Sequence, residues 1–244
     1  MHTVSTTGKH NGESGNVLFL ILIAVALFAA LSYAVTQSSR SGGGDAGKET
    51  NLVNSAQMTQ YPSGIRTSIV RMIISGADIA SIEFNAPSLF GTLTATTPVG
   101  ALGVFHPSGG GATYAQAPGD VMASGATQGS WIFNGENQIF NIGTSENAAT
   151  PTAATADIIA FLPGVSTSVC NKLNEELGLP ATPVVETGVD VATIMGSATP
   201  GLCNGGCGGT IGDNADAANK LNGQPFGCFS QSAQLVYFHV LVER

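Results

Sequence analysis

An unbroken apolar segment near the amino terminus is the strongest feature of the hydrophobic pattern. Residues 17–35 read VLFLILIAVALFAALSYAV, and no charged residue occurs between Ser14 and Ser39. As a helix, these nineteen residues extend about 28 Å, close to the thickness of the hydrocarbon core of a bilayer. A cleaved secretory signal has a shorter apolar stretch. Most helices of soluble proteins keep a polar face, which this segment lacks. We therefore predict a transmembrane helix over residues 16–36.

The residues after this segment predict a break and then a second helix. Three consecutive glycines occupy positions 42–44, and each destabilises a helix interior by about 1 kcal/mol. We expect a Gly-rich hinge over residues 37–47 and a second helical region from residue 48, interrupted near Pro62 and ending near residue 75. Four of its apolar positions repeat at helical spacing and predict a face that packs on a sheet: Ile65, Ile69, Met72 and Ile73.

The rest of the chain alternates between short apolar segments and turn-forming residues, which predicts an antiparallel sheet. Asn134-Gly135 between two such segments indicates a hairpin. The last segment is the richest in branched and aromatic residues and is expected in the middle of the sheet. The expected strands cover residues 82–84, 91–97, 101–106, 130–133, 138–142, 157–162 and 234–242.

A short helix is expected before the last third of the head. Ser166 or Thr167 suits its N-cap and Gly178 its C-terminal stop. Its apolar stripe consists of Val169, Leu173 and Leu177, and Cys170 lies beside that stripe.

Composition excludes one class of partner. The chain is 43% apolar and 10% charged, with a formal net charge of -8. A protein this acidic has no surface to neutralise a run of phosphates, so we expect no nucleic-acid partner.

Cysteine usage indicates disulfide bonds. Cys203 and Cys207 are close enough to pair with each other, which leaves Cys170 with Cys228. Pairing Cys170 with Cys203 and Cys207 with Cys228 fits nearly as well, and sequence does not decide between them. A four-cysteine zinc site normally uses two close pairs, and only one is present.

No recognised catalytic motif occurs in the sequence, so we expect no catalytic residue, no metal site and no cofactor. His106 lies in a Gly-rich turn, and His239 lies among apolar residues of the last expected strand. A histidine in such a strand is more often a packed residue than a general base. Asp213 and Asp216 lack the full pattern of a calcium loop and are better explained as a solvated turn.

A short polar leader precedes the apolar segment. Residues 1–15 read MHTVSTTGKHNGESG, and the apolar helix begins directly after Gly15. This arrangement resembles the prepilin signal of type IV pilins and pseudopilins. The resemblance implies cleavage by a prepilin peptidase between Gly15 and Asn16, methylation of the new amino terminus and helix-on-helix assembly. The chain departs from the family at the fifth mature position, where Leu20 replaces the glutamate that helps to set the register between subunits. That departure favours a minor subunit or a plain membrane anchor.

The resemblance also implies an architecture. Pilins have a long N-terminal helix whose first half is embedded in the membrane and whose second half packs on an antiparallel sheet, and a disulfide pins their C-terminal region. We therefore expect an α+β fold with a leader peptide (1–15), a transmembrane helix (16–36), a hinge (37–47) and a pilin-like head (48–244). The disulfide framework places the head outside the inner membrane, in the periplasm or beyond it.

Two functions from different classes follow. The first is a structural subunit of a type IV pilus-like or type II secretion-like filament, anchored in the inner membrane before assembly. Its partners are copies of itself or other pilin-like subunits, bound through the N-terminal helix. The alternative is a bitopic membrane-anchored extracytoplasmic protein that binds or senses a ligand and does not polymerise. An anchored hydrolase comes third.

Overall fold

A computed structural model describes residues 14–124, 127–143, 150–204, 206–213 and 221–244. The chain divides into two compact units, Met1–Glu49 and Thr50–Arg244. We refer to the second unit as the head. It begins two residues beyond position 48, where the sequence places the start of the head.

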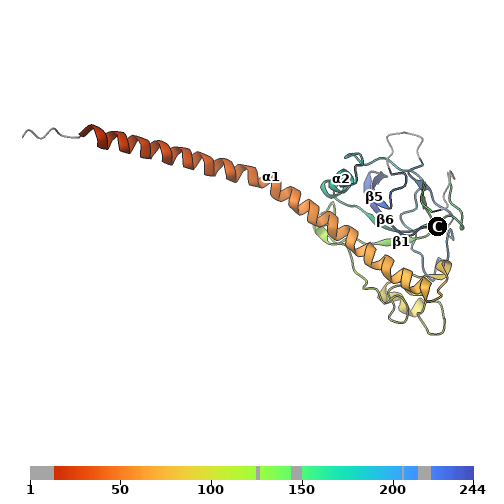
Figure 1. Ribbon diagram of the computed structural model, residues 1–244. Coiled ribbons are helices and arrows are strands. Elements are labelled where there is room, and N and C mark those ends of the chain that lie inside the picture. The colour runs from red at the N-terminus through yellow and green to blue at the C-terminus, as the bar shows by residue number, and fades with distance from the viewer. Residues whose placement is uncertain (1–13, 125–126, 144–149, 205, 214–220) are drawn as a thin grey trace, which may run out of the picture. The chain divides into compact units, whose positions relative to one another are not determined.

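One long helix, α1 (Ser14–Ile74), contributes to both units (Figure 1). The sequence predicts a hinge at residues 37–47 and a break near Pro62, but the backbone is helical through both. Glycine lowers helix stability without removing any backbone donor or acceptor, so the ladder of i to i−4 hydrogen bonds can continue. Pro62 lacks one N–H group, and its side chain is buried in the head, so packing there offsets the lost hydrogen bond.

The centre of the head is a four-stranded antiparallel sheet in the order β1-β3-β6-β5. Its strands are β1 (Ile132–Asn134), β3 (Ile158–Pro163), β5 (Phe226–Gln231) and β6 (Gln234–Val242). A separate two-stranded parallel sheet is formed by β2 (Gln138–Ile139) and β4 (Thr210–Ile211). The interior position of β6 confirms the prediction for the last apolar segment.

The hairpin predicted at Asn134-Gly135 is wrong. The strand before it, β1, pairs with β3, and the strand after it, β2, pairs in parallel with β4. Asn134 is the last residue of β1, and the chain bends at Gly135 and Glu136 before it enters the second sheet. Long-range pairing therefore decides the strand partners.

The three strands expected between residues 82 and 106 do not form. This part of the head contains short 3-10 helices at η1 (Ile79–Ser81) and η2 (Pro87–Thr92), a third such helix follows at η3 (Gly119–Val121), and an isolated parallel bridge joins Glu83 to Gly103. Its backbone segments approach closely: a Cβ atom on Gly109 would lie 2.2 Å from the carbonyl oxygen of Gly103. In this part of the head, glycine backbones pack closely together instead of forming the continuous hydrogen-bond ladder of a β-sheet.

The apolar stripe predicted on the second half of α1 is confirmed. Ile65, Ile69 and Met72 are buried, and Ile73 is half-buried against the same cluster. In Figure 1 this half of α1 lies along the head beside the sheet. The helix therefore acts as one layer of an α+β core.

Side chains along β6 alternate between the two faces of the sheet, as a strand requires. Tyr237 and Leu241 belong to the hydrophobic cluster that contains the α1 stripe. Phe238 and Val240 belong to a second cluster, which also contains Phe161 of β3. The central strand thus contributes to a core on each side of the sheet.

The short helix predicted after the strand at residues 157–162 is also observed, as α2 (Thr167–Glu176). The Ser166 side chain caps it by accepting a hydrogen bond from the backbone N–H of Val169. Gly178 follows with φ +69°, a left-handed conformation that glycine adopts without steric strain.

Candidate functional site

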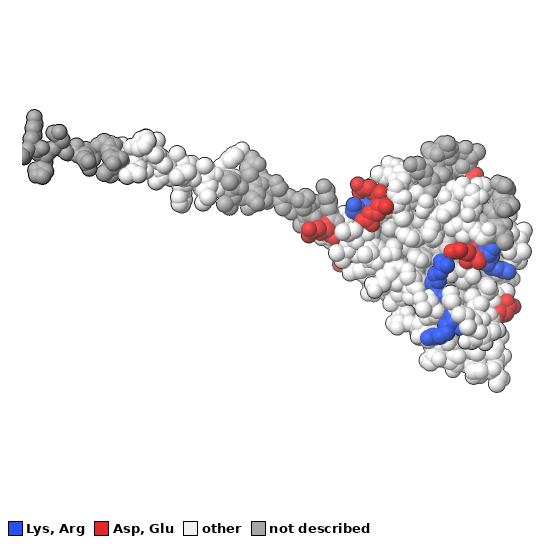
Figure 2. Space-filling view, in the orientation of Figure 1, with Lys and Arg blue, Asp and Glu red and all other residues white. Residues whose placement is uncertain are grey.

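The first unit presents an apolar helix surface that we call the anchor segment, residues 18–33. Every residue of this segment is exposed, and its large apolar side chains between Leu18 and Leu31 are 40% to 75% exposed. Because consecutive helical residues are rotated by about 100°, six successive apolar residues from Leu18 to Ile23 cover all sides of the helix. In Figure 2 the described residues of the segment are white, with no charged side chain among them.

Hydroxyl groups in this region are satisfied within the helix. The Ser32 hydroxyl donates to the backbone carbonyl of Phe28 at 2.8 Å, and the Thr36 hydroxyl donates to that of Ser32. Both bonds span one helical turn, so neither hydroxyl depends on water for a partner.

Within the part of the chain that the structure describes, no helix is both long and apolar enough to span a bilayer. The side chains at positions 16, 17, 34 and 35 of the expected transmembrane helix lie outside that part. The cleavage candidates Gly15 and Asn16 lie in the first turn of α1, and the leader residues 1–13 are outside the described residues.

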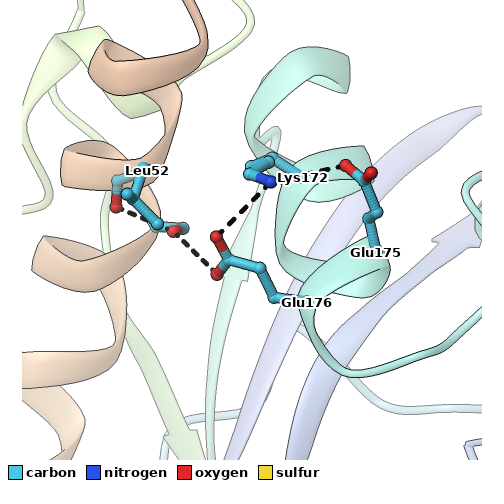
Figure 3. A network of polar contacts seen from close by, with 5 residues as sticks. Leu52, Lys172, Glu175 and Glu176 are labelled. Atoms are coloured by element: carbon cyan, nitrogen blue, oxygen red, sulfur yellow. Dashed lines mark hydrogen bonds and ion pairs between the residues drawn. The ribbon is translucent and has the colours of Figure 1, made fainter.

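A polar network links the second half of α1 to α2 within the head (Figure 3). The Ser55 hydroxyl lies 2.9 Å from the carbonyl oxygen of Leu52 and 3.4 Å from the Glu176 carboxylate. Lys172 in turn lies 3.8 Å from Glu176 and 3.5 Å from Glu175. Both ion pairs lie within α2 and contribute little to stability, so the Ser55–Glu176 hydrogen bond is the contact of this network that joins the two helices.

Two disulfides occur in the head, and the four cysteines leave none free. Cys170 of α2 is bonded to Cys228 of β5, and Cys203 is bonded to Cys207. This is one of the two pairings that the sequence leaves open. The first bond ties α2 to the edge strand of the sheet, and the second closes a turn of the surface loop.

His239 is a packed residue on the sheet face that α1 covers. Its ring stacks on Phe226, and its Nδ1 lies 2.8 Å from the Tyr237 hydroxyl. Burial, with a smaller contribution from the charge of Arg66, lowers the pKa of His239 to about 4. Burial also raises the pKa of Tyr237 well above its usual value, so its hydroxyl keeps its proton and can donate to a neutral imidazole.

Arg66 connects α1 to the end of β6. Its Nη1 donates to the carbonyl oxygen of Val240 at 3.4 Å, and its Nη2 lies 3.1 Å from the Glu243 carboxylate. The positive charge therefore lies near the His239 ring, which contributes to keeping that ring neutral.

Asp157 is a buried carboxyl group, and the sequence pattern predicts it only as the first residue of the strand expected over residues 157–162. It accepts hydrogen bonds from the backbone N–H groups of Ile139 and Arg244, each at 2.9 Å. Burial nevertheless raises its pKa to about 7. It lies just before β3, beside β2 and the C-terminal residue, so its carboxyl oxygens link three segments of the head.

The remaining sequence candidates do not form a chemical site in the described residues. His106 accepts a hydrogen bond from the Ser108 backbone N–H at 3.1 Å, and its ring packs edge-on against Phe90. Asp216 lies outside the described residues, whereas Asp213 is exposed. Among the residues that the structure describes, no three His, Cys, Asp or Glu residues are grouped so as to hold a metal ion.

Comparisons with known proteins add no relative to this description. No family model matches the chain, and no curated protein or solved structure is significantly similar to it.

Proposed function

We propose that this protein is a structural subunit of a type IV pilus-like or type II secretion-like filament, anchored in the inner membrane before assembly. The observation that carries the proposal is the anchor segment: a helix that is apolar on every side and exposed over its whole circumference. A surface of this kind is unfavourable in water, because the free energy of the system falls when apolar surface is removed from contact with water. Lipid before assembly and neighbouring helices afterwards both supply that cover.

The head part of α1 already has a partner for its main apolar stripe. Ile65, Ile69 and Met72 are buried against the sheet, whereas Leu52, Val53, Val70 and Ile74 stay exposed. Every described side chain of residues 18–33 is exposed, so this segment has more apolar surface left for assembly than the head part does. Helix association through a segment without charge relies on close packing of side chains rather than on ion pairs.

The two disulfides support a location outside the cytoplasm, since disulfides persist in oxidising compartments. The periplasm or the cell exterior is such a compartment. In this proposal the prepilin peptidase removes residues 1–15, and Asn16 becomes the methylated amino terminus.

A bitopic protein that binds or senses a ligand without polymerising is the second candidate. It is favoured by Leu20, which is 59% exposed at the position where the resembled family has glutamate. An uncharged residue there cannot make a charge-dependent contact that sets the register between subunits. Such a protein would keep the anchor segment in lipid permanently.

Processing is tested by mass spectrometry of the amino terminus of the membrane-bound protein. The proposal predicts that the mature chain starts at Asn16, and that Gly15→Leu leaves residues 1–15 attached. Gly12→Leu is the matched control, because it alters a glycine of the same leader away from the cleavage site, and its processing should be normal. An intact amino terminus in the unaltered protein, or equal processing of both variants, would count against the assignment.

Assembly is tested by cysteine cross-linking in membranes. Leu27 in the anchor segment and Val185 on the head have similar exposed fractions, 66% and 64%. In a filament subunit, Leu27→Cys should cross-link copies of the chain, whereas Val185→Cys should do so far less. A chain that stays monomeric with either cysteine favours the bitopic alternative.

A further inference from the structure

A cavity of about 560 Å³ opens in the head, and all of the residues that line it belong to that unit. Its walls come from four separate stretches of the chain, and four of the lining residues are aromatic: Phe84, Tyr114, Trp131 and Phe133. The rings of Phe84 and Phe133 are stacked, with centroids 4.9 Å apart. Volumes of this order hold small organic molecules in other proteins.

Backbone hydrogen bonds fix the walls relative to one another. The Phe84 N–H donates to the carbonyl oxygen of Met195 at 2.9 Å, and the Met195 N–H donates to that of Phe133 at 2.8 Å. Three distant segments are thus held side by side by their main chains. A ligand would enter a cavity that is already formed, which reduces the entropy lost on binding.

One corner of the cavity is polar and rigid. Asn85, which is 8% exposed, donates from Nδ2 to the hydroxyl oxygens of Thr92 at 2.9 Å and Ser197 at 3.0 Å. Its Oδ1 accepts from the Ser197 backbone N–H at 3.3 Å. A Cβ atom on Gly196 would lie 2.3 Å from this Oδ1, so glycine leaves room for the amide at that point.

The lining selects the class of ligand. It contains no Lys, Arg, Asp, Glu or His, so it offers no counter-charge to an ion. A sugar carries many hydroxyls, each of which needs a partner when it leaves water, and the polar corner already uses most of its own groups internally. Tyr114 is 39% exposed, whereas Phe84, Trp131 and Phe133 are 6% exposed or less. An apolar lining with an accessible aromatic ring favours another aromatic ring, by offset stacking or edge-to-face contact.

We propose that this cavity is a binding site for a neutral aromatic molecule of about two rings that carries one hydrogen-bond donor. The donor is placed against the Ser197 hydroxyl oxygen and Asn85 Oδ1, because the side-chain donors of both residues are already used within the head. The site does not depend on assembly, because all of its walls belong to the head.

The chain provides its own reporter, since Trp131 is its single tryptophan and lines the cavity. The probe is 4′-bromobiphenyl-4-ol, a neutral two-ring molecule whose bromine quenches tryptophan emission on contact. With the full-length protein in lipid vesicles, the probe should quench Trp131 saturably with one site per chain. Methyl glucoside and biphenyl-4-sulfonate, which are polar and charged, should not displace it. Absence of saturable quenching, or displacement by the glucoside, would overturn the proposal.

Two variants locate the bound probe. Ala198→Phe places a ring in the cavity from an exposed lining position, and it should weaken binding by about tenfold or more. Ala123→Phe adds the same ring at an exposed position outside the lining, and its binding should be unchanged. Equal effects of the two would show that the probe binds to the anchor segment or to lipid, and would refute the site.

Ser197→Ala tests the polar corner. It should weaken binding of the hydroxylated probe while leaving 4-bromobiphenyl, which lacks the hydroxyl, unaffected. Loss of both probes in a variant whose thermal unfolding is unchanged, or loss of neither, would remove the assigned role of Ser197.

Discussion

Cys170 in α2 and Cys228 in β5 are joined by a disulfide across 58 residues of sequence, with their Cα atoms 5.6 Å apart. A cross-link over a loop of this length mainly restricts the unfolded chain. Replacing both residues by alanine should therefore lower the free energy of unfolding by about 4 kcal/mol. Denaturant unfolding of the variant and the unaltered protein measures the difference.

The second disulfide is the internal control. Cys203 and Cys207 are separated by 4 positions, so the same relation gives a smaller loss of about 2 kcal/mol. Equal losses from the two double variants would contradict this explanation. Peptide mapping without reductant should also recover these two pairs and no others.

The lowered pKa of His239 predicts that the free energy of unfolding falls in acid. Its pKa in the folded protein is about 4, against 6.5 for an ordinary histidine, because it is buried and faces Arg66. The folded state therefore binds the proton less tightly than the unfolded state does. Its contribution to stability is complete above about pH 6.5 and is lost as the pH falls toward 4. In His239→Gln this part of the pH dependence of the unfolding free energy should disappear, and an unchanged pH profile would refute it.

The raised pKa of Asp157 predicts the opposite slope of the free energy of unfolding against pH. Burial raises its pKa from 3.8 to about 7, so the folded state binds this proton more tightly than the unfolded state. The stabilisation is complete below about pH 4 and is lost as the pH rises to about 7. Asp157→Asn should abolish this loss, since the amide does not titrate.

The two groups oppose each other between about pH 4 and pH 6.5. Unfolding measured across this range should give a flatter curve for the unaltered protein than for either variant. The slopes of His239→Gln and Asp157→Asn should have opposite signs. Slopes of the same sign would show that other groups dominate the titration.

Local patterns in the sequence predicted the elements whose form depends on few distant contacts. The helix after Ser166 had a cap, an apolar stripe and a terminating glycine, and it folds as expected. The last strand had a long branched and aromatic run, and it occupies the interior of the sheet. In both cases propensity and burial favour the same structure.

The errors occur where long-range contacts override local preference. Strand β5 was not predicted, because Gly227, Cys228 and Ser230 give it little strand propensity; its pairing with β6 and the Cys170 disulfide place it in the sheet. The break expected near Pro62 is absent because that residue is buried on the head.

Neither the cavity nor the burial of Tyr237 and His239 follows from a pattern in the sequence. Phe84 and Trp131 lie 47 positions apart in the sequence and reach one cavity only through the fold. Tyr237 and His239 could have been placed on one face of a strand by their spacing, but their burial depends on the packing of α1.

Two glycines of the head should respond oppositely to alanine. Gly64 is exposed within α1, and a Cβ atom there would meet nothing within 4 Å, so Gly64→Ala should raise the free energy of unfolding by about 0.5–1 kcal/mol through helix propensity. At Gly109 the same atom would lie 2.2 Å from the Gly103 carbonyl oxygen and 2.7 Å from that of Gly100. Backbone atoms cannot rotate aside, so Gly109→Ala should lower stability by about 2 kcal/mol. Urea unfolding of both variants tests the pair, and a stabilising Gly109→Ala would show that this loop packs less closely than the structure indicates.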